Sequence, residues 1–146
     1  MSARRGFICS NEPESGVTTS YNNAQGILLD GTGTLDAGAT SLPGAAYLSH
    51  IEVQGDQTGA TVGTITFFLT WDAAGNYPVS GESAAVTCVN GLTDLSRRGF
   101  AVGLDVWIQS TDRQETPGGL YLWCKTDAGT VTIEEARIFW AIRRSG

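Results

Sequence analysis

The chain has 146 residues, of which 41% are hydrophobic and 16% charged, and this balance excludes an intrinsically disordered chain, which would carry more charge and fewer aromatic residues. The formal net charge of −6 argues against a general nucleic-acid binder, because such proteins need a basic surface to displace counterions from phosphates. A chain of this length can bury its own core, so we expect one domain over residues 1–146.

Weak strand candidates occupy the first third of the chain, where short apolar stretches lie between turn-forming residues. They cover residues 6–10, 17–21, 26–29 and 32–36. A stronger candidate follows between residues 47 and 53, because its residues alternate in character. We expect Tyr47, Ser49, Ile51 and Val53 on its inward face and His50 and Glu52 on the other.

Residues 60–71 have the period of two that is typical of a half-buried strand. The apolar set is Ile65, Phe67, Leu69 and Trp71, and it alternates with Thr64, Thr66, Phe68 and Thr70. Residues 72–76 favour a turn, because Gly75 and Asn76 tolerate a positive φ. A weaker strand candidate follows at residues 83–89.

Two more strands are expected in the second half of the chain. For residues 100–108, the inward set is Phe100, Val102, Leu104, Val106 and Ile108, against Ala101, Gly103, Asp105, Trp107 and Gln109. For residues 120–125, the inward set is Leu120, Leu122 and Cys124, against Tyr121, Trp123 and Lys125.

The last segment, residues 129–144, is compatible with a helix or with a long strand. Val131 and Ile133 share one phase, whereas Ala136, Ile138, Trp140 and Ile142 share the opposite phase. The phase changes at Glu134 and Glu135, where a β-bulge would restore the register and keep both sets inward. We therefore predict a bulged strand. With eight to ten short strands in all, the sequence indicates an all-β fold, an antiparallel β-sandwich of jelly-roll-like type.

The sequence carries no convincing catalytic set. Residues 31–36 begin like a dinucleotide-binding loop but lack its last glycine. Ser83 with His50 would need an orienting carboxylate to act as a nucleophile and base, and a single histidine disfavours most zinc sites. Calcium remains open at Asp30 with Asp36, or at Asp112 with Glu115. We predict no catalytic residue, no cofactor and no defined metal site, and therefore a protein that is not an enzyme.

The cysteines and the first residues bear on the compartment. Cys9, Cys88 and Cys124 form no C-x-x-C pair and are expected as buried thiols in a reducing environment. The start of the chain lacks an apolar stretch of signal-peptide length, and no run is long enough to cross a bilayer. We expect synthesis in the cytoplasm without secretion.

Two features suggest surfaces for binding. Arg4, Arg5, Arg137, Arg143 and Arg144 lie near the two ends, whereas residues 6–136 carry four basic and fifteen acidic residues, so ends that meet in space would form a basic patch. The outward aromatic residues Trp107, Tyr121 and Trp123 could anchor a partner, stack on a sugar, or belong to the core. Our candidate interface is Arg4, Arg5, Trp107, Tyr121, Trp123, Arg143 and Arg144.

In general character the chain resembles the small β-sandwich head decoration or cement proteins of tailed-bacteriophage virions. The resemblance depends on Gly/Thr-rich strands such as residues 64–71 with the turn at 72–76, few lysines, no secretion signal, unpaired cysteines and no catalytic set. It implies a virion structural protein, made in the host cytoplasm, that forms symmetric dimers or trimers. Its partners would be the major capsid protein or other virion proteins, with no membrane or direct nucleic-acid binding. The alternative is a carbohydrate- or receptor-binding module of a phage tail or fibre.

Overall fold

The computed structural model describes residues 3–10, 12–21, 26–30, 38–58, 63–79, 86–87, 99–109 and 119–143. Within these ranges the chain forms nine strands and no helix. The strands are β1 (Ala3–Cys9), β2 (Glu14–Val17), β3 (Ile27–Leu29), β4 (Ala46–Thr58), β5 (Thr64–Thr70), β6 (Val86–Thr87), β7 (Gly99–Ile108), β8 (Leu120–Thr126) and β9 (Thr130–Arg143).

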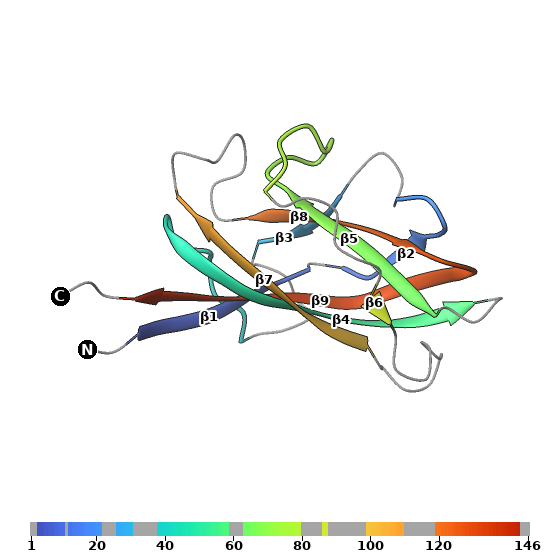
Figure 1. The fold of residues 1–146 in the computed structure, drawn as a ribbon, viewed down its shortest axis with the longest axis horizontal. Coiled ribbons are helices and arrows are strands. Elements are labelled where there is room, and N and C mark those ends of the chain that lie inside the picture. The colour runs from blue at the N-terminus through green and yellow to red at the C-terminus, as the bar shows by residue number, and fades with distance from the viewer. Residues whose placement is uncertain are drawn as a thin grey trace.

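The strands make two antiparallel sheets that pack face to face (Figure 1). The first sheet has the order β1-β9-β4-β7, with β2 also paired to β9, and the second has the order β3-β8-β5-β6. The first strand therefore pairs with the last, β3 with β8, β4 with β7, and β5 with β6. This nested pairing, divided alternately between two sheets, is a jelly roll. The all-β sandwich predicted from the sequence is confirmed.

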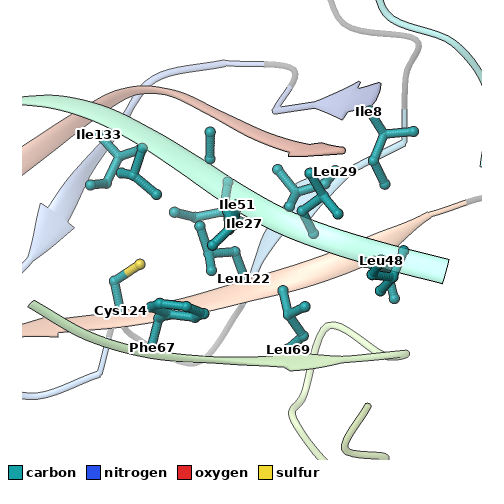
Figure 2. Close-up of a cluster of buried hydrophobic side chains, with 14 of the residues drawn as sticks. Ile8, Ile27, Leu29, Leu48, Ile51, Phe67, Leu69, Leu122, Cys124 and Ile133 are labelled. Atoms are coloured by element: carbon teal, nitrogen blue, oxygen red, sulfur yellow. The ribbon is translucent and has the colours of Figure 1, made fainter. Parts of the chain in front are cut away.

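The core lies between the two sheets and draws large aliphatic side chains from both (Figure 2). From Thr64 to Leu69 the residues of β5 alternate between half-buried and buried as the period of two requires, with Phe67 and Leu69 inward. Ile8 and Ile51 of the first sheet and Leu122 of the second are fully buried. Removing this much apolar surface from water is the main source of stability for such a sandwich.

The final strand has the predicted bulge. In the pairing of β4 with β9, Gln54 faces Glu135 but the next residue, Gly55, faces Ile133, so Glu134 is the extra residue. Val131 and Ile133 before it and Ala136, Ile138 and Trp140 after it are all buried. The bulged strand is confirmed, and the helix alternative is wrong.

A second bulge overturns the prediction that Tyr47 faces inward. Leu48 pairs with Trp140 and His50 with Phe139, so Ser49 is an extra residue in β4. The two inward positions are consequently Leu48 and Ile51, both fully buried, and Tyr47 lies on the outer face. Ser49, also predicted inward, is half-buried and donates its hydroxyl hydrogen to the carbonyl of Phe139.

The weaker strand predictions have mixed outcomes. Residues 6–10 and 26–29 largely match β1 and β3. The strand predicted at residues 17–21 is wrong except at Val17, because β2 ends there and residues 18–20 form a bend. The candidate at residues 32–36 lies outside the described residues, and of residues 83–89 only β6 is described. Cys9 and Cys124 are buried and form no disulfide, while Cys88 lies outside the described ranges.

Candidate binding surface

The outer face of the first sheet carries a row of rings that crosses three strands. Phe7 of β1 pairs with Phe139 of β9, which pairs with His50 of β4. The ring centroids of Phe7 and Phe139 are 5.5 Å apart, and the His50 ring stacks on Phe139 at 4.4 Å with an interplanar angle of 7°. These residues point outward because their neighbours Ile8, Ile51 and Ile138 are in the core.

A second aromatic pair lies beside this row, where Tyr47 of β4 faces Trp107 of β7. Their ring centroids are 5.4 Å apart with an interplanar angle of 45°. Trp107 is 65% exposed, as its predicted outward phase requires. The Tyr47 hydroxyl donates a hydrogen bond to Oδ1 of Asp105. This bond, together with desolvation and the charge of Asp105, raises the pKa of Tyr47, so the phenol remains a donor at neutral pH.

The backbone of β7 is irregular beside these rings. Between the pairs His50–Gly103 and Leu48–Val106, β7 has one residue more than β4, and Asp105 has a φ of 51°. A non-glycine residue with positive φ is uncommon. Such strained backbone persists where the surrounding structure maintains it, and it is found most often at functional sites. Bulges of this kind re-aim side chains, and this one directs the Asp105 carboxylate toward Tyr47.

Polar groups surround the ring of His50. Its Nδ1 lies 3.0 Å from the Ser49 hydroxyl, and its Nε2 lies 3.7 Å from Oε1 of Glu52. The Ser49 hydroxyl also donates to the carbonyl of Phe139, so it can accept from Nδ1 of His50 in the tautomer that carries a proton there.

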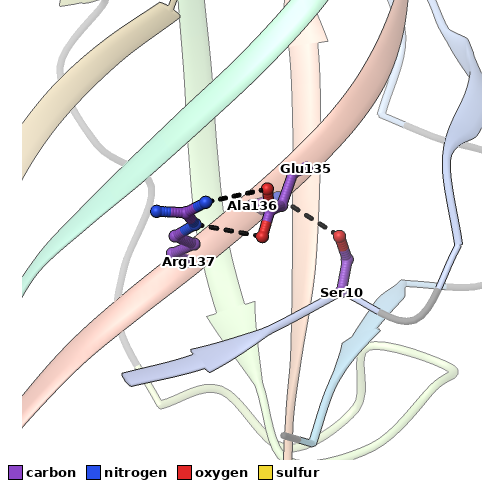
Figure 3. A network of polar contacts seen from close by, with 4 residues as sticks. All are labelled: Ser10, Glu135, Ala136 and Arg137. Carbon is purple, nitrogen blue, oxygen red and sulfur yellow. Dashed lines mark hydrogen bonds and ion pairs between the residues drawn. The ribbon is translucent and has the colours of Figure 1, made fainter. Parts of the chain in front are cut away.

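An ion pair on β9 lies on the same outer face, next to β1. The Arg137 guanidinium donates from Nε and Nη2 to the two carboxylate oxygens of Glu135 at 3.0 and 3.1 Å (Figure 3). Its carbon Cζ lies 5.5 Å from the centroid of the Phe7 ring. Ser10, at the end of β1, accepts a hydrogen bond from the Ala136 backbone N–H. Arg137 is therefore neutralised by Glu135 and contributes little to a basic surface.

The first and last strands, β1 and β9, lie side by side (Figure 1). Ala3 pairs with Arg143, Arg4 with Ile142 and Arg5 with Ala141. Arg5 is exposed. Only the backbone of Arg4 and Arg143 is described, and Arg144 lies outside the described residues. The pairing nevertheless brings the arginine-bearing segments to one edge region of the first sheet.

Trp123 points outward from the second sheet, as predicted, but it is covered and only 6% exposed. Phe68 stacks on it at 5.7 Å with an interplanar angle of 2°, and the indole N–H donates to the Thr70 hydroxyl. A Cβ on Gly26 or Gly75 would come within 2.8 or 3.0 Å of the indole, so two glycines let loops pack on it. Trp123 is therefore not an accessible anchor. Tyr121, on the same face, is half-buried.

Several residues of the outer face were missing from the sequence-based candidate interface. Phe7, His50 and Phe139 occupy outward phases that the alternation of their strands could have revealed. Tyr47 could not have been found in this way, because the bulge at Ser49 reverses its phase.

We find no metal centre in the described part of the chain, where no group of three or more His, Cys, Asp or Glu side chains could hold an ion. Asp36, Asp112 and Glu115 of the two calcium alternatives, and Ser83 of the nucleophile alternative, lie outside that part. In the same ranges no helix is long and apolar enough to cross a membrane.

Comparisons with known proteins find a structural similarity but no related family. No protein-family model and no curated protein matches the chain. Among solved structures, it is similar to a family two carbohydrate esterase from Cellvibrio japonicus, with 9% identity and a TM-score of 0.36. The similarity covers 99% of this chain and 37% of the esterase, so the chain spans little more than a third of that enzyme. Neither value is high enough to transfer the enzyme's activity.

Proposed function

We propose that this chain is a binding and assembly protein without catalytic activity, and specifically an accessory protein of a virion. In this role, as a head decoration or cement protein, it docks on the major capsid protein or another virion protein. The observation that carries the proposal is the exposed aromatic outer face of the first sheet, centred on Trp107 and Tyr47. Partly exposed aromatic residues of this kind are preferred anchors at protein interfaces.

The fold supports this role only by analogy, since jelly rolls occur in viral capsid proteins and in lectins alike. The charge distribution adds a physical argument. Arg4 and Arg5 of β1 lie beside the segment of β9 that ends at Arg143, whereas all fifteen acidic residues lie in residues 6–136. A basic edge on an acidic body orients the molecule on a partner of complementary charge, and such an interaction weakens with salt.

Capsid co-sedimentation tests the docking. Replacing Arg143 and Arg144 by alanine is expected to lower occupancy on capsids most at low salt, and the difference from the parent should shrink as the salt concentration rises, because salt screens the arginine contribution in the parent. Replacement of Arg97 and Arg98 by alanine is the matched control, because it removes the same charge at positions far from both ends in the sequence. Equal occupancy for both double variants and the parent would contradict docking through the chain ends.

The same proposal predicts self-association, because capsid sites are symmetric. Light scattering on the purified protein at low and high salt is expected to give a defined dimer or trimer at both. A monomer that also fails to co-sediment with capsids would count against an assembly role.

A second candidate function is a carbohydrate- or receptor-binding module of a phage tail or fibre. It is favoured by the arrangement around Trp107, where an exposed ring lies beside the hydrogen-bonding groups of Tyr47 and Asp105.

A further inference from the structure

We propose that Trp107, Tyr47, Asp105 and Gly103 form a saccharide subsite for a neutral glycan, one whose next rings lie toward His50 and Phe139. This inference rests on the second candidate function and names its ligand class and its residues.

The first argument is the environment of the Trp107 ring. Tyr47 contacts it at a centroid distance of 5.4 Å, which holds the indole in place, yet the side chain remains 65% exposed. The face of an aromatic ring is the negative part of its quadrupole and attracts the polarised C–H groups of a pyranose. A ring that is fixed and still open meets this requirement without reorganisation on binding.

The second argument is that a hydrogen-bonding group lies fixed beside the ring. Asp105 is two residues before Trp107, and its positive φ of 51° places the carboxylate against the Tyr47 hydroxyl. That hydrogen bond uses one oxygen, Oδ1, whereas an ionised carboxylate accepts at about four lone-pair positions. The remaining positions can accept the hydroxyl groups of a sugar, and the bond to Tyr47 restricts the rotamer that presents them.

The third argument is open space along the same face. A Cβ built on Gly103 would meet no atom within 4 Å, and Gly103 faces His50, which is stacked on Phe139. Because Ser49 is an extra residue, Tyr47 and His50 face Ala141 and Phe139, which are two residues apart on β9, roughly 7 Å at ~3.3 Å per residue. The two aromatic pairs are thus farther apart than the length of one pyranose ring. An oligosaccharide can reach both pairs, whereas a monosaccharide can reach only one.

The charges on this face determine which glycans fit. Asp105 and Glu52 lie next to the two aromatic pairs, and the nearby Arg137 is neutralised by Glu135. A sialylated or sulfated glycan would bring negative charge against these carboxylates, which costs free energy at short range. Neutral hexoses and N-acetylated hexosamines carry only hydroxyl and amide groups, so they avoid that cost.

A panel of neutral and acidic oligosaccharides, followed by calorimetry, tests the proposal. The parent protein is expected to bind a neutral oligosaccharide, to bind the corresponding monosaccharide more weakly, and to ignore acidic glycans. Trp107→Ala should weaken binding by about tenfold or more, and Asp105→Asn should weaken it less. Gly103→Leu should reduce the affinity for the oligosaccharide but not for the monosaccharide.

Tyr77→Ala is the matched control, because Tyr77 is 44% exposed and lies in the turn after β5 of the second sheet, whereas β7 belongs to the first sheet. Near-ultraviolet circular dichroism establishes that each variant is folded. The proposal is overturned if the parent binds no neutral glycan, or if Trp107→Ala and Tyr77→Ala bind equally well.

Capsid co-sedimentation of the same variants separates this inference from the docking proposal. If no glycan binds and Trp107→Ala loses capsid occupancy, Trp107 is a protein anchor and the saccharide subsite is refuted while docking stands. If glycan binding is lost in Trp107→Ala but capsid occupancy is unchanged, the saccharide subsite is supported.

Discussion

Asp127 holds the turn between β8 and β9 against the start of β5. Its carboxylate accepts a hydrogen bond from the Gly63 backbone N–H at 3.0 Å. The backbone hydrogen bond at Thr64 is the largest cause of a lowered pKa of Asp127; desolvation opposes it, and the hydrogen bond from Gly63 lowers the pKa further. A lowered pKa means that the folded state binds this proton less tightly than the unfolded chain, so Asp127 stabilises the fold above its unfolded pKa of about 4.

Asp127→Asn is therefore expected to lower the free energy of unfolding at pH 7 by less than about 1 kcal/mol, because interactions of an exposed charge are screened by solvent. The difference from the parent should shrink as the pH falls below about 4 and the carboxyl becomes protonated in both states. Urea unfolding of both proteins at about pH 7 and pH 2.5 measures it. A difference that is the same at both pH values would show that the charge is not involved.

Cys124 is expected to be chemically inert in the folded protein. Burial raises the pKa of its thiol to about 12, and the thiolate is the reactive species. Iodoacetamide at about pH 8 should leave Cys124 unmodified in the native protein and modify it fully in guanidinium chloride, as read by peptide mass spectrometry. Labelling at similar rates in both conditions would mean that the second sheet opens readily.

The residues of the candidate surface show where sequence reasoning succeeds at this scale. Trp107 is outward because regular alternation leads into Ile108, which is buried. The burial of Trp123 could not be foreseen, because Gly26 and Gly75 approach it from segments far away in the sequence. Period and phase give the direction of a side chain, but tertiary contacts decide whether it reaches solvent.

At the scale of single strands, the two bulges differ in how visible they are in the sequence. In β9 the apolar phase changes across a pair of glutamates, so an extra residue there is the simplest way to keep both halves inward. In β4 the adjacent Tyr47 and Leu48 are both large and apolar, so either can be assigned to the core. The sequence pattern consequently locates the bulge at Glu134 and misses the one at Ser49.

The bulge in β9 leads to a deletion test. Removing Glu134 leaves Ile133, Glu135 and Ala136 in perfect alternation, so every buried side chain of the strand keeps its face. We expect this deletion to be tolerated, at a cost below about 2 kcal/mol. Removing Phe139 instead moves Trp140 from the core to the outer face, and we expect a loss of about 3–5 kcal/mol, as for truncating a core tryptophan.

Thermal and urea unfolding of the two deletion variants make the comparison. Each variant lacks one residue of the same strand, so a general intolerance of β9 to shortening would destabilise both alike. Equal losses would therefore refute the assignment of Glu134 as the extra residue.

At the scale of the whole molecule, the sequence predicted the class of fold but not the pairing of its strands. The strand count and the alternation favour a sandwich, because each strand has one apolar face to bury. The pairing of the strands could not be predicted in this way, because β1 pairs with β9 and β3 with β8, and most of the sequence separates the members of each pair. Nothing local in the residues of either strand specifies such a distant partner, and it is selected only when both sheets close over one core.

The adjacency of the chain ends gives the last prediction. Ala3 faces Arg143, so joining Gly146 to Met1 leaves residues 144–146 and 1–2 as a hairpin connection between β9 and β1. Connections of about three to five residues are common in antiparallel hairpins. The cyclic protein is expected to fold as the linear one does and to gain about 2–4 kcal/mol, because closure restricts the unfolded chain. Traceless intein cyclisation and calorimetry measure the effect, with the linear chain as the control. A lower melting temperature in the cyclic form would mean that the connection strains the first sheet and that its edge strand is not held as described.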